Sequence, residues 1–175
     1  LGLGAAHVSG EYIPGSAQHT RPTLLEGAQL VEQLGSKTLK VYLTPNVAEK
    51  YGDSFSPVSS LAELAASPAF EALFARPFDT FVLTTYSFAL GVGDPWRQGF
   101  TDAQAQAEEE EFFQLTHHLL TKYRDRDVRF VLQNWEGDWA LLAGYNPSAT
   151  VPAARADAMA KWLSARQRGV ARARA

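Results

Sequence analysis

Four stretches of the chain have the hydrophobic pattern of a buried strand, and each precedes a long loop and a stretch with helical spacing. The strands are expected near residues 3–8, 38–44, 81–88 and 128–135. In the second strand Leu39, Val41 and Leu43 alternate with polar neighbours, which predicts one apolar face and one polar face. The repeated strand–helix order predicts an α/β fold with parallel strands in the order 1-2-3-4.

The helices are predicted from apolar positions three and four residues apart, and from residues that start or stop helices. They are expected near residues 23–34, 60–74, 101–123 and 152–174. Gly35 provides a stop, Pro68 a break and Thr101 an N-terminal cap. The acidic run Glu108–Glu111 is expected to form a solvated helix face.

Long loops follow the strands, whereas the joints from each helix to the next strand are short. The long loops are residues 9–22, 45–59, 89–100 and 137–151. Ordinary connections have about 4–6 residues, and much longer ones usually carry function. Because the strands are parallel, all four loops should lie at the carboxyl edge of the sheet, which is the functional face of barrels and doubly wound sheets.

A barrel fits better than a doubly wound sheet. No glycine-rich phosphate-binding fingerprint opens a helix, so a nucleotide site is not expected. Residues 1–175 are interpreted as one α/β domain of the TIM-barrel type with four strand–helix units, that is, half a barrel. A complete barrel of such units would need roughly 350 residues. The chain is therefore expected to be the N-terminal part of a longer protein, and its partner the missing C-terminal half.

Composition excludes several classes of protein. The net charge of −3 provides no broad basic surface for nucleic acid. The sequence has no apolar run of about 18 residues, so no membrane span is predicted. The absence of cysteine excludes disulfides and thiolate zinc sites. The sequence starts at Leu1 rather than at methionine, so removal of a leader peptide would fit, which slightly favours an extracytoplasmic location without fixing it.

The end of the fourth strand places two carboxylates between two tryptophans. Glycosidic cleavage needs two carboxyl groups facing one bond, and one of them must stay protonated near neutral pH. Glu136 is the first candidate for the general acid/base, and Asp138 is the alternative. Trp135 and Trp139 could form the apolar wall that keeps an acid protonated, or a platform for a sugar ring. Asn134 precedes Glu136 by two residues and could bind a sugar hydroxyl beside it.

The four-unit order and the strand end Leu132-Gln133-Asn134-Trp135-Glu136 resemble the (β/α)8 glycoside hydrolases of the large retaining clan with an acid/base glutamate at the end of strand 4. In that clan an asparagine usually stands directly before the glutamate, whereas Trp135 intervenes here. The resemblance implies hydrolysis of an oligo- or polysaccharide without a cofactor. It also implies a nucleophile at the end of strand 7, beyond this sequence.

Residues at the other strand ends and loops complete the predicted substrate site. The candidates are His7, Glu11, Lys40, Tyr42, Tyr86 and Trp96. His7 also fits a core histidine, and Trp135 also fits barrel packing. Two alternatives stay open: a non-catalytic sugar-binding or assembly protein, and a metal-dependent hydrolase with His7, Glu11 and Glu136 as ligands. No H-x-H or H-E-x-x-H pattern supports the metal enzyme, so no metal is predicted.

Overall fold

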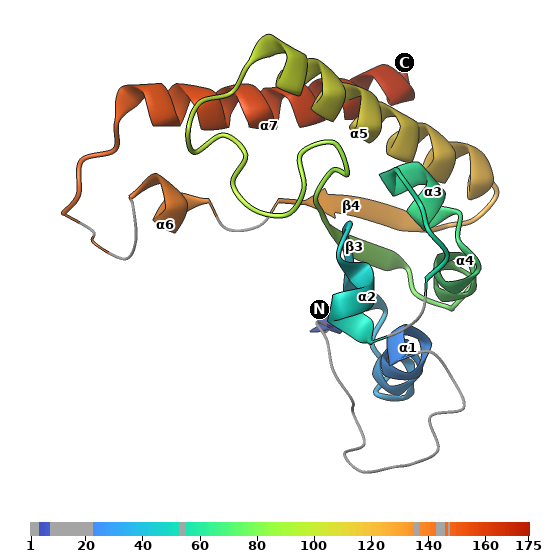
Figure 1. Cartoon of the computed structure of the whole chain (residues 1–175). Coiled ribbons are helices and arrows are strands. Elements are labelled where there is room, and N and C mark those ends of the chain that lie inside the picture. The colour runs from blue at the N-terminus through green and yellow to red at the C-terminus, as the bar shows by residue number, and fades with distance from the viewer. Residues whose placement is uncertain (1–3, 8–22, 53–54, 135–136, 143–145, 147) are drawn as a thin grey trace.

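The computed structural model describes residues 4–7, 23–52, 55–134, 137–142, 146 and 148–175 (Figure 1). Its strands are β1 (Gly4–Ala6), β2 (Thr38–Leu43), β3 (Thr80–Thr85) and β4 (Arg129–Gln133). They form one parallel sheet in the order β1-β2-β3-β4. The predicted α/β class, strand order and strand direction are confirmed.

Two faces of the sheet follow from its register. Leu39 of β2 is paired with Phe81 of β3, which is paired with Phe130 of β4, so three apolar side chains form a row across the sheet. The rings of Phe81 and Phe130 stack, with centroids 5.7 Å apart. In a second row, three residues further along the strands, Tyr42 is paired with Thr84, which is paired with Gln133. Because side chains alternate along a strand, this second row belongs to the opposite, more polar face.

Five of the described helices lie near their predicted positions. They are α1 (Thr23–Gln33), α3 (Leu61–Ala65), α4 (Pro68–Phe74), α5 (Asp102–Lys122) and α7 (Ala153–Arg174). Gly35 follows α1 with a φ of 79°, a conformation that glycine adopts without strain. The predicted cap of α5 is also confirmed, because Thr101 Oγ1 accepts a hydrogen bond from Gln104 N–H at 3.2 Å.

Two short helices, α2 (Val47–Tyr51) and α6 (Asp138–Leu141), were not predicted. They lie in the long loops that follow β2 and β4. Both are shorter than two turns, so periodicity could not distinguish them from irregular loop.

The main core lies between the apolar face of the sheet and the longer helices. It contains Leu24 of α1, Leu64 of α3, Phe74 of α4 and Phe112 of α5, all almost fully buried against the strands. Figure 1 shows α5 and α7 side by side, with α3 and α4 next to α5 and α1 further along. A single helix layer on one face is the arrangement that half of a (β/α)8 barrel would have.

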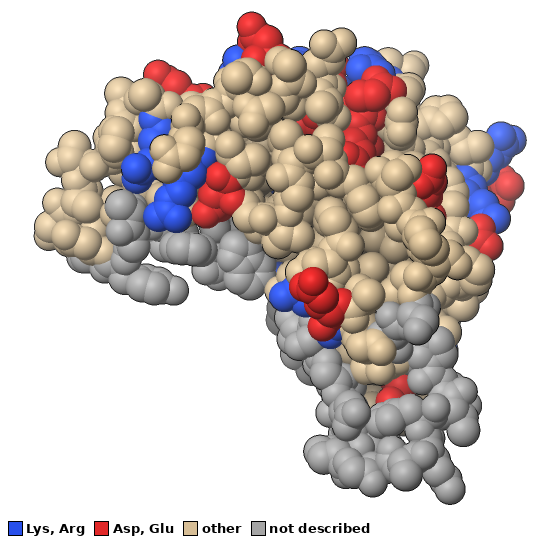
Figure 2. All heavy atoms as spheres, in the orientation of Figure 1, with Lys and Arg blue, Asp and Glu red and all other residues tan. Residues whose placement is uncertain are grey.

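The interpretation of Glu108–Glu111 as a solvated face is wrong for two of its members. Glu108 and Glu111 have relative exposures of only 1% and 8%. The other two glutamates remain at the surface, where Glu109 pairs with Arg168 at 2.7 Å. Figure 2 shows basic and acidic side chains next to each other at several places on the face in view. The physical reason differs for the two buried residues. Glu108 is covered by Trp162 and Arg166 of α7. Glu111 instead accepts hydrogen bonds from the first turn of α3 and from the loop after β3.

The two helices approach very closely at Gly169 of α7. A Cβ atom at this position would lie 2.3 Å from the carbonyl oxygen of Glu109. Only glycine therefore allows this spacing between α5 and α7. None of the helices in the described ranges is long and apolar enough to cross a lipid bilayer.

Candidate functional site

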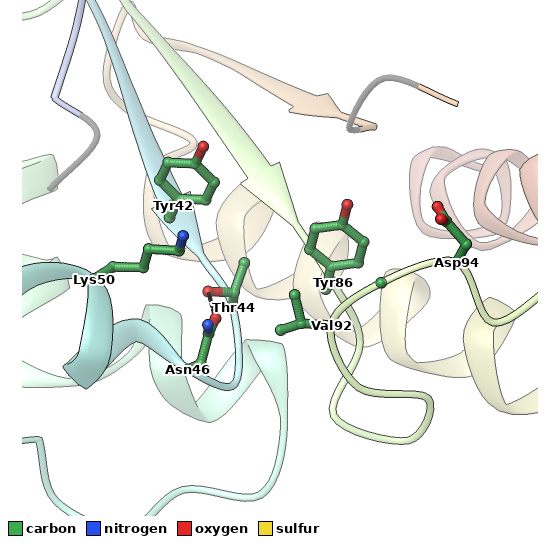
Figure 3. A pocket seen from close by; sticks show the side chains of 8 residues that line it. Tyr42, Thr44, Asn46, Lys50, Tyr86, Val92 and Asp94 are labelled. Atoms are coloured by element: carbon green, nitrogen blue, oxygen red, sulfur yellow. Dashed lines mark hydrogen bonds between the residues drawn. The ribbon is translucent and has the colours of Figure 1, made fainter. Parts of the chain in front are cut away.

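A pocket of about 250 Å³ opens where β2 and β3 end (Figure 3). Its walls come from the carboxyl ends of these strands and from the loops that follow them. The lining residues are Tyr42, Thr44, Asn46, Lys50, Tyr86, Val92, Gly93 and Asp94. This is the edge at which the loop lengths predicted a functional face.

Hydrogen bonds to neighbouring backbone fix the α2 side of the pocket. The hydroxyl of Tyr51 on α2 accepts from Tyr42 N–H at 2.8 Å and donates to the His7 carbonyl at 3.0 Å. Thr44 Oγ1 donates to Asn46 Oδ1 at 2.9 Å. These hydrogen bonds fix α2 against β1 and β2, and Lys50 is a residue of this helix.

Two phenols and two charged groups define the electrostatics of the pocket. Burial raises the pKa of Tyr86 to about 12, with the negative charge of Asp94 adding to the effect. Burial also raises the pKa of Tyr42. Both phenols therefore stay protonated near neutral pH and keep a hydroxyl for hydrogen bonding. Lys50 Nζ lies 4.9 Å from the centroid of the Tyr42 ring, within the range of a cation–π contact.

A buried ion pair lies behind this edge of the sheet, between α5 and α7. Arg166 Nε is 3.0 Å from Glu108 Oε1, and the two side chains have exposures of 4% and 1%. Trp162 Nε1 donates to Glu108 Oε1 at 2.9 Å, and Ser87 Oγ donates to Glu108 Oε2. Burial lowers the pKa of Arg166 to about 10, against the raising effect of Glu108, so Arg166 is charged at neutral pH.

The guanidinium of Arg166 also holds the ends of β3 and β4. Its Nη2 donates to the carbonyl oxygen of Thr85, and its Nη1 donates to Asn134 Oδ1. Its carbon centre is 4.1 Å from the ring centroid of Phe112. We call the residues joined by these hydrogen bonds and the ion pair the Arg166 cluster: Thr85, Ser87, Glu108, Asn134, Trp162 and Arg166.

Glu111 anchors the start of the loop after β3. Its Oε1 accepts from Phe88 N–H at 2.8 Å and from Leu61 N–H at 3.1 Å, and its Oε2 accepts from Ala89 N–H at 3.1 Å. Burial raises the pKa of Glu111 although these bonds oppose the rise. One carboxylate thus joins α5 to the first turn of α3 and to the loop that continues to Asp94.

Several predicted site residues lie on the polar face or at its edge. Tyr42 and Tyr86 line the pocket. Lys40 precedes Tyr42 by two residues on β2 and therefore projects to the same face. Asn134 is exposed, and its amide oxygen accepts from Arg166, which directs that oxygen toward α7.

His7 and Trp96 lie among packed side chains. His7 is completely buried, with Nε2 3.0 Å from the Thr23 carbonyl oxygen. Its ring lies over Gly27 of α1, where a Cβ atom would be 2.4 Å from Nε2. Trp96 is also completely buried, in a second core with Trp162 of α7 at a ring distance of 6.4 Å. Neither residue is among those that line the pocket.

The other predicted residues cannot be placed as side chains. Glu11, Trp135 and Glu136 lie outside the described residues. Asp138 and Trp139 are the first residues of α6, but their side chains are likewise outside the description.

Sequence reasoning missed the charged residues that the structure brings together. Glu108 stands at helical spacing between Ala105 and Phe112, both buried, and Arg166 follows buried Trp162 by four residues. This spacing within an apolar stripe was the available signal. Lys50 had no such signal, because its position depends on a five-residue helix inside a loop.

Within the described residues, no group of three or more histidine, aspartate or glutamate side chains is placed to hold a metal ion. Searches against protein-family models, curated proteins and solved structures found no match to this chain.

Proposed function

We propose that the protein is a carbohydrate-active hydrolase that cleaves a glycosidic bond by carboxylate acid/base catalysis. The observation that carries this proposal is the pocket where β2 and β3 end, in which Tyr42 and Tyr86 stand beside amide and carboxylate groups. Aromatic rings can cover the apolar face of a sugar, and neighbouring polar groups can bind its hydroxyls.

The arrangement of strands and helices supports a barrel as the scaffold. Four parallel strands in sequential order, with the longer helices on one face, are consistent with the first half of the (β/α)8 pattern. In such a barrel the polar face of β2 and β3 would be the interior, and the pocket would lie at its carboxyl end. A C-terminal half would supply the remaining strands and the second catalytic carboxylate.

Glu136 is the proposed general acid/base, with Asp138 as the alternative. Glu136 follows Asn134 by two residues, and Asn134 is held by Arg166. The Arg166 cluster therefore fixes the chain just before the proposed acid. On this proposal Trp135 and Trp139 provide the apolar surroundings that favour the protonated carboxyl.

Replacement of Glu136 tests the proposal in the full-length protein. Glu136→Gln keeps the size of the side chain but removes its proton, so turnover of substrates with poor leaving groups should fall by about 10²–10⁴. Substrates with activated leaving groups should be much less affected in the cleavage step.

Asp138→Asn is the matched control and should retain turnover. If instead Asp138→Asn is inactive while Glu136→Gln is unchanged, Asp138 is the acid. A protein that binds glycans and hydrolyses none would be the non-catalytic sugar-binding alternative, and the hydrolase proposal would be wrong.

A further inference from the structure

We propose that this pocket binds an acidic sugar residue, with the anionic group, a carboxylate or a sulfate ester, placed beside Lys50. The inference rests on the proposed function only in that the ligand is a sugar; the charge preference is carried by the pocket itself. It concerns Lys50, which is not among the site residues predicted from the sequence.

Lys50 provides a cation without a carboxylate partner in the described part of the chain. Several other basic side chains near the surface are paired with carboxylates, as Lys161 is with Asp102 at 2.6 Å and Lys122 with Glu71 at 2.8 Å. Lys50 instead lies over the Tyr42 ring and forms no ion pair within the described ranges. A half-buried ammonium in this position can gain a charge-assisted bond from a ligand anion.

Asp94 places a negative charge in the pocket, opposite in sign to the charge of Lys50. Figure 3 shows Lys50 and Asp94 on opposite sides of the pocket, with Tyr86 and Val92 between them. A carboxylate accepts hydrogen bonds only, so Asp94 suits the hydroxyl groups of a sugar and repels its anionic group. The two charges together orient an acidic sugar with its anion toward α2.

The size of the pocket fits a single sugar ring. Its volume of about 250 Å³ lies just below the range of about 300–1,000 Å³ that drug-sized ligands occupy. The pocket is therefore interpreted as one subsite for one residue of a longer chain, with Tyr42 and Tyr86 as its aromatic side chains.

The test is calorimetric titration of the full-length protein with four tetrasaccharides that differ in charge. The probes are tetragalacturonate, a sulfated tetragalactan, neutral cellotetraose and the tetramer of glucosamine. The two acidic probes should bind more tightly than the neutral one, and the cationic probe should bind most weakly. The tighter of the two acidic probes identifies the anion as carboxylate or sulfate.

Lys50→Met should weaken binding of the preferred acidic probe by about 10- to 100-fold, the usual effect of losing a hydrogen bond to a charged group. Binding of cellotetraose should change by less than about twofold, because its contact with the ammonium carries no charge. Lys50→Arg should retain most of the preference. Lys37→Met is the matched control, since it removes the same charge from an exposed position at the opposite end of β2.

The outcomes separate this inference from the proposed function. If cellotetraose or the glucosamine tetramer binds best, or if Lys50→Met leaves acidic binding unchanged, the charge preference is wrong while sugar binding stands. If none of the four probes binds and the protein hydrolyses no glycan, the proposed function and this inference are both wrong.

Discussion

Removal of Arg166 should strongly destabilise the helix layer. Arg166→Met keeps much of the apolar stem but leaves Glu108 as a buried carboxylate with only Ser87 and Trp162 as hydrogen-bond donors. Breaking a buried pair in this way typically costs about 3–5 kcal/mol, because the remaining charge has lost its partner in a place that water does not reach.

The expected effect is large enough for simple unfolding measurements. For a domain of this size about 1 kcal/mol corresponds to roughly 2–4 °C, so the melting temperature of Arg166→Met should fall by roughly 6–20 °C. Urea unfolding followed by circular dichroism gives the free energy directly. Arg166→Lys, which keeps the charge and loses the fork that reaches Thr85 and Asn134, should be intermediate.

Arg168→Met is the control, because Arg168 is paired with Glu109 at 2.7 Å but is 53% exposed. Exposed pairs contribute about 0–1 kcal/mol, so this variant should resemble the wild-type protein. The double variant Arg166→Met/Glu108→Leu should recover much of the lost stability, since it removes both charges. An Arg166→Met variant that is no less stable than Arg168→Met, or a double variant as unstable as the sum of its single changes, would contradict this prediction.

Two further predictions concern α5 and α7. Burial raises the pKa of Glu111, so the folded protein keeps the proton on this carboxyl to higher pH than the unfolded chain does. The protonated carboxyl therefore contributes to the free energy of unfolding at low pH. This contribution is lost as the pH rises from the ordinary carboxyl range through the raised pKa. Urea titrations over a pH series should show this step in the wild-type protein and not in Glu111→Gln, whereas Glu110→Gln should leave it in place. Gly169→Ala should lower the melting temperature despite the better helix propensity of alanine, because the added Cβ would meet the Glu109 carbonyl. Ser164→Ala, at an exposed position of α7, is the control and should not lower it. If Gly169→Ala is as stable as the wild-type protein, α5 and α7 can move apart without loss of stability.

The sheet could be predicted from the sequence because its pattern is local and repeated. Leu39, Val41 and Leu43 alternate with polar residues, and each helix ends or begins at a residue with a known preference, such as Gly35 or Thr101. Parallel strands joined by helices then allow few orders, and the predicted sequential order is confirmed.

The sequence predicted that the site lies at the carboxyl edge of the sheet, but it did not predict which residues meet there. Strand ends and loop lengths pointed to Tyr42 and Tyr86, which do line the pocket. Lys50 and Asp94 reach the same pocket from two different loops, and their meeting depends on tertiary structure that no short pattern encodes. Trp96 was expected at this edge because it lies in a long loop, but that loop folds back and buries it against α7.

The buried charged residues of α5 and α7 provide hydrogen-bond partners for backbone groups at the strand ends. Beyond Thr85 the backbone of β3 leaves the sheet, and its polar groups lose their neighbours in the ladder. Arg166 satisfies the Thr85 carbonyl, and Glu111 satisfies the amides of Phe88 and Ala89. An apolar pair in place of Glu108 and Arg166 could match the stability of the helix layer, yet it could not donate a hydrogen bond to the Thr85 carbonyl. The charges are therefore explained by the placement of the loops at the proposed binding edge, and not by stability alone.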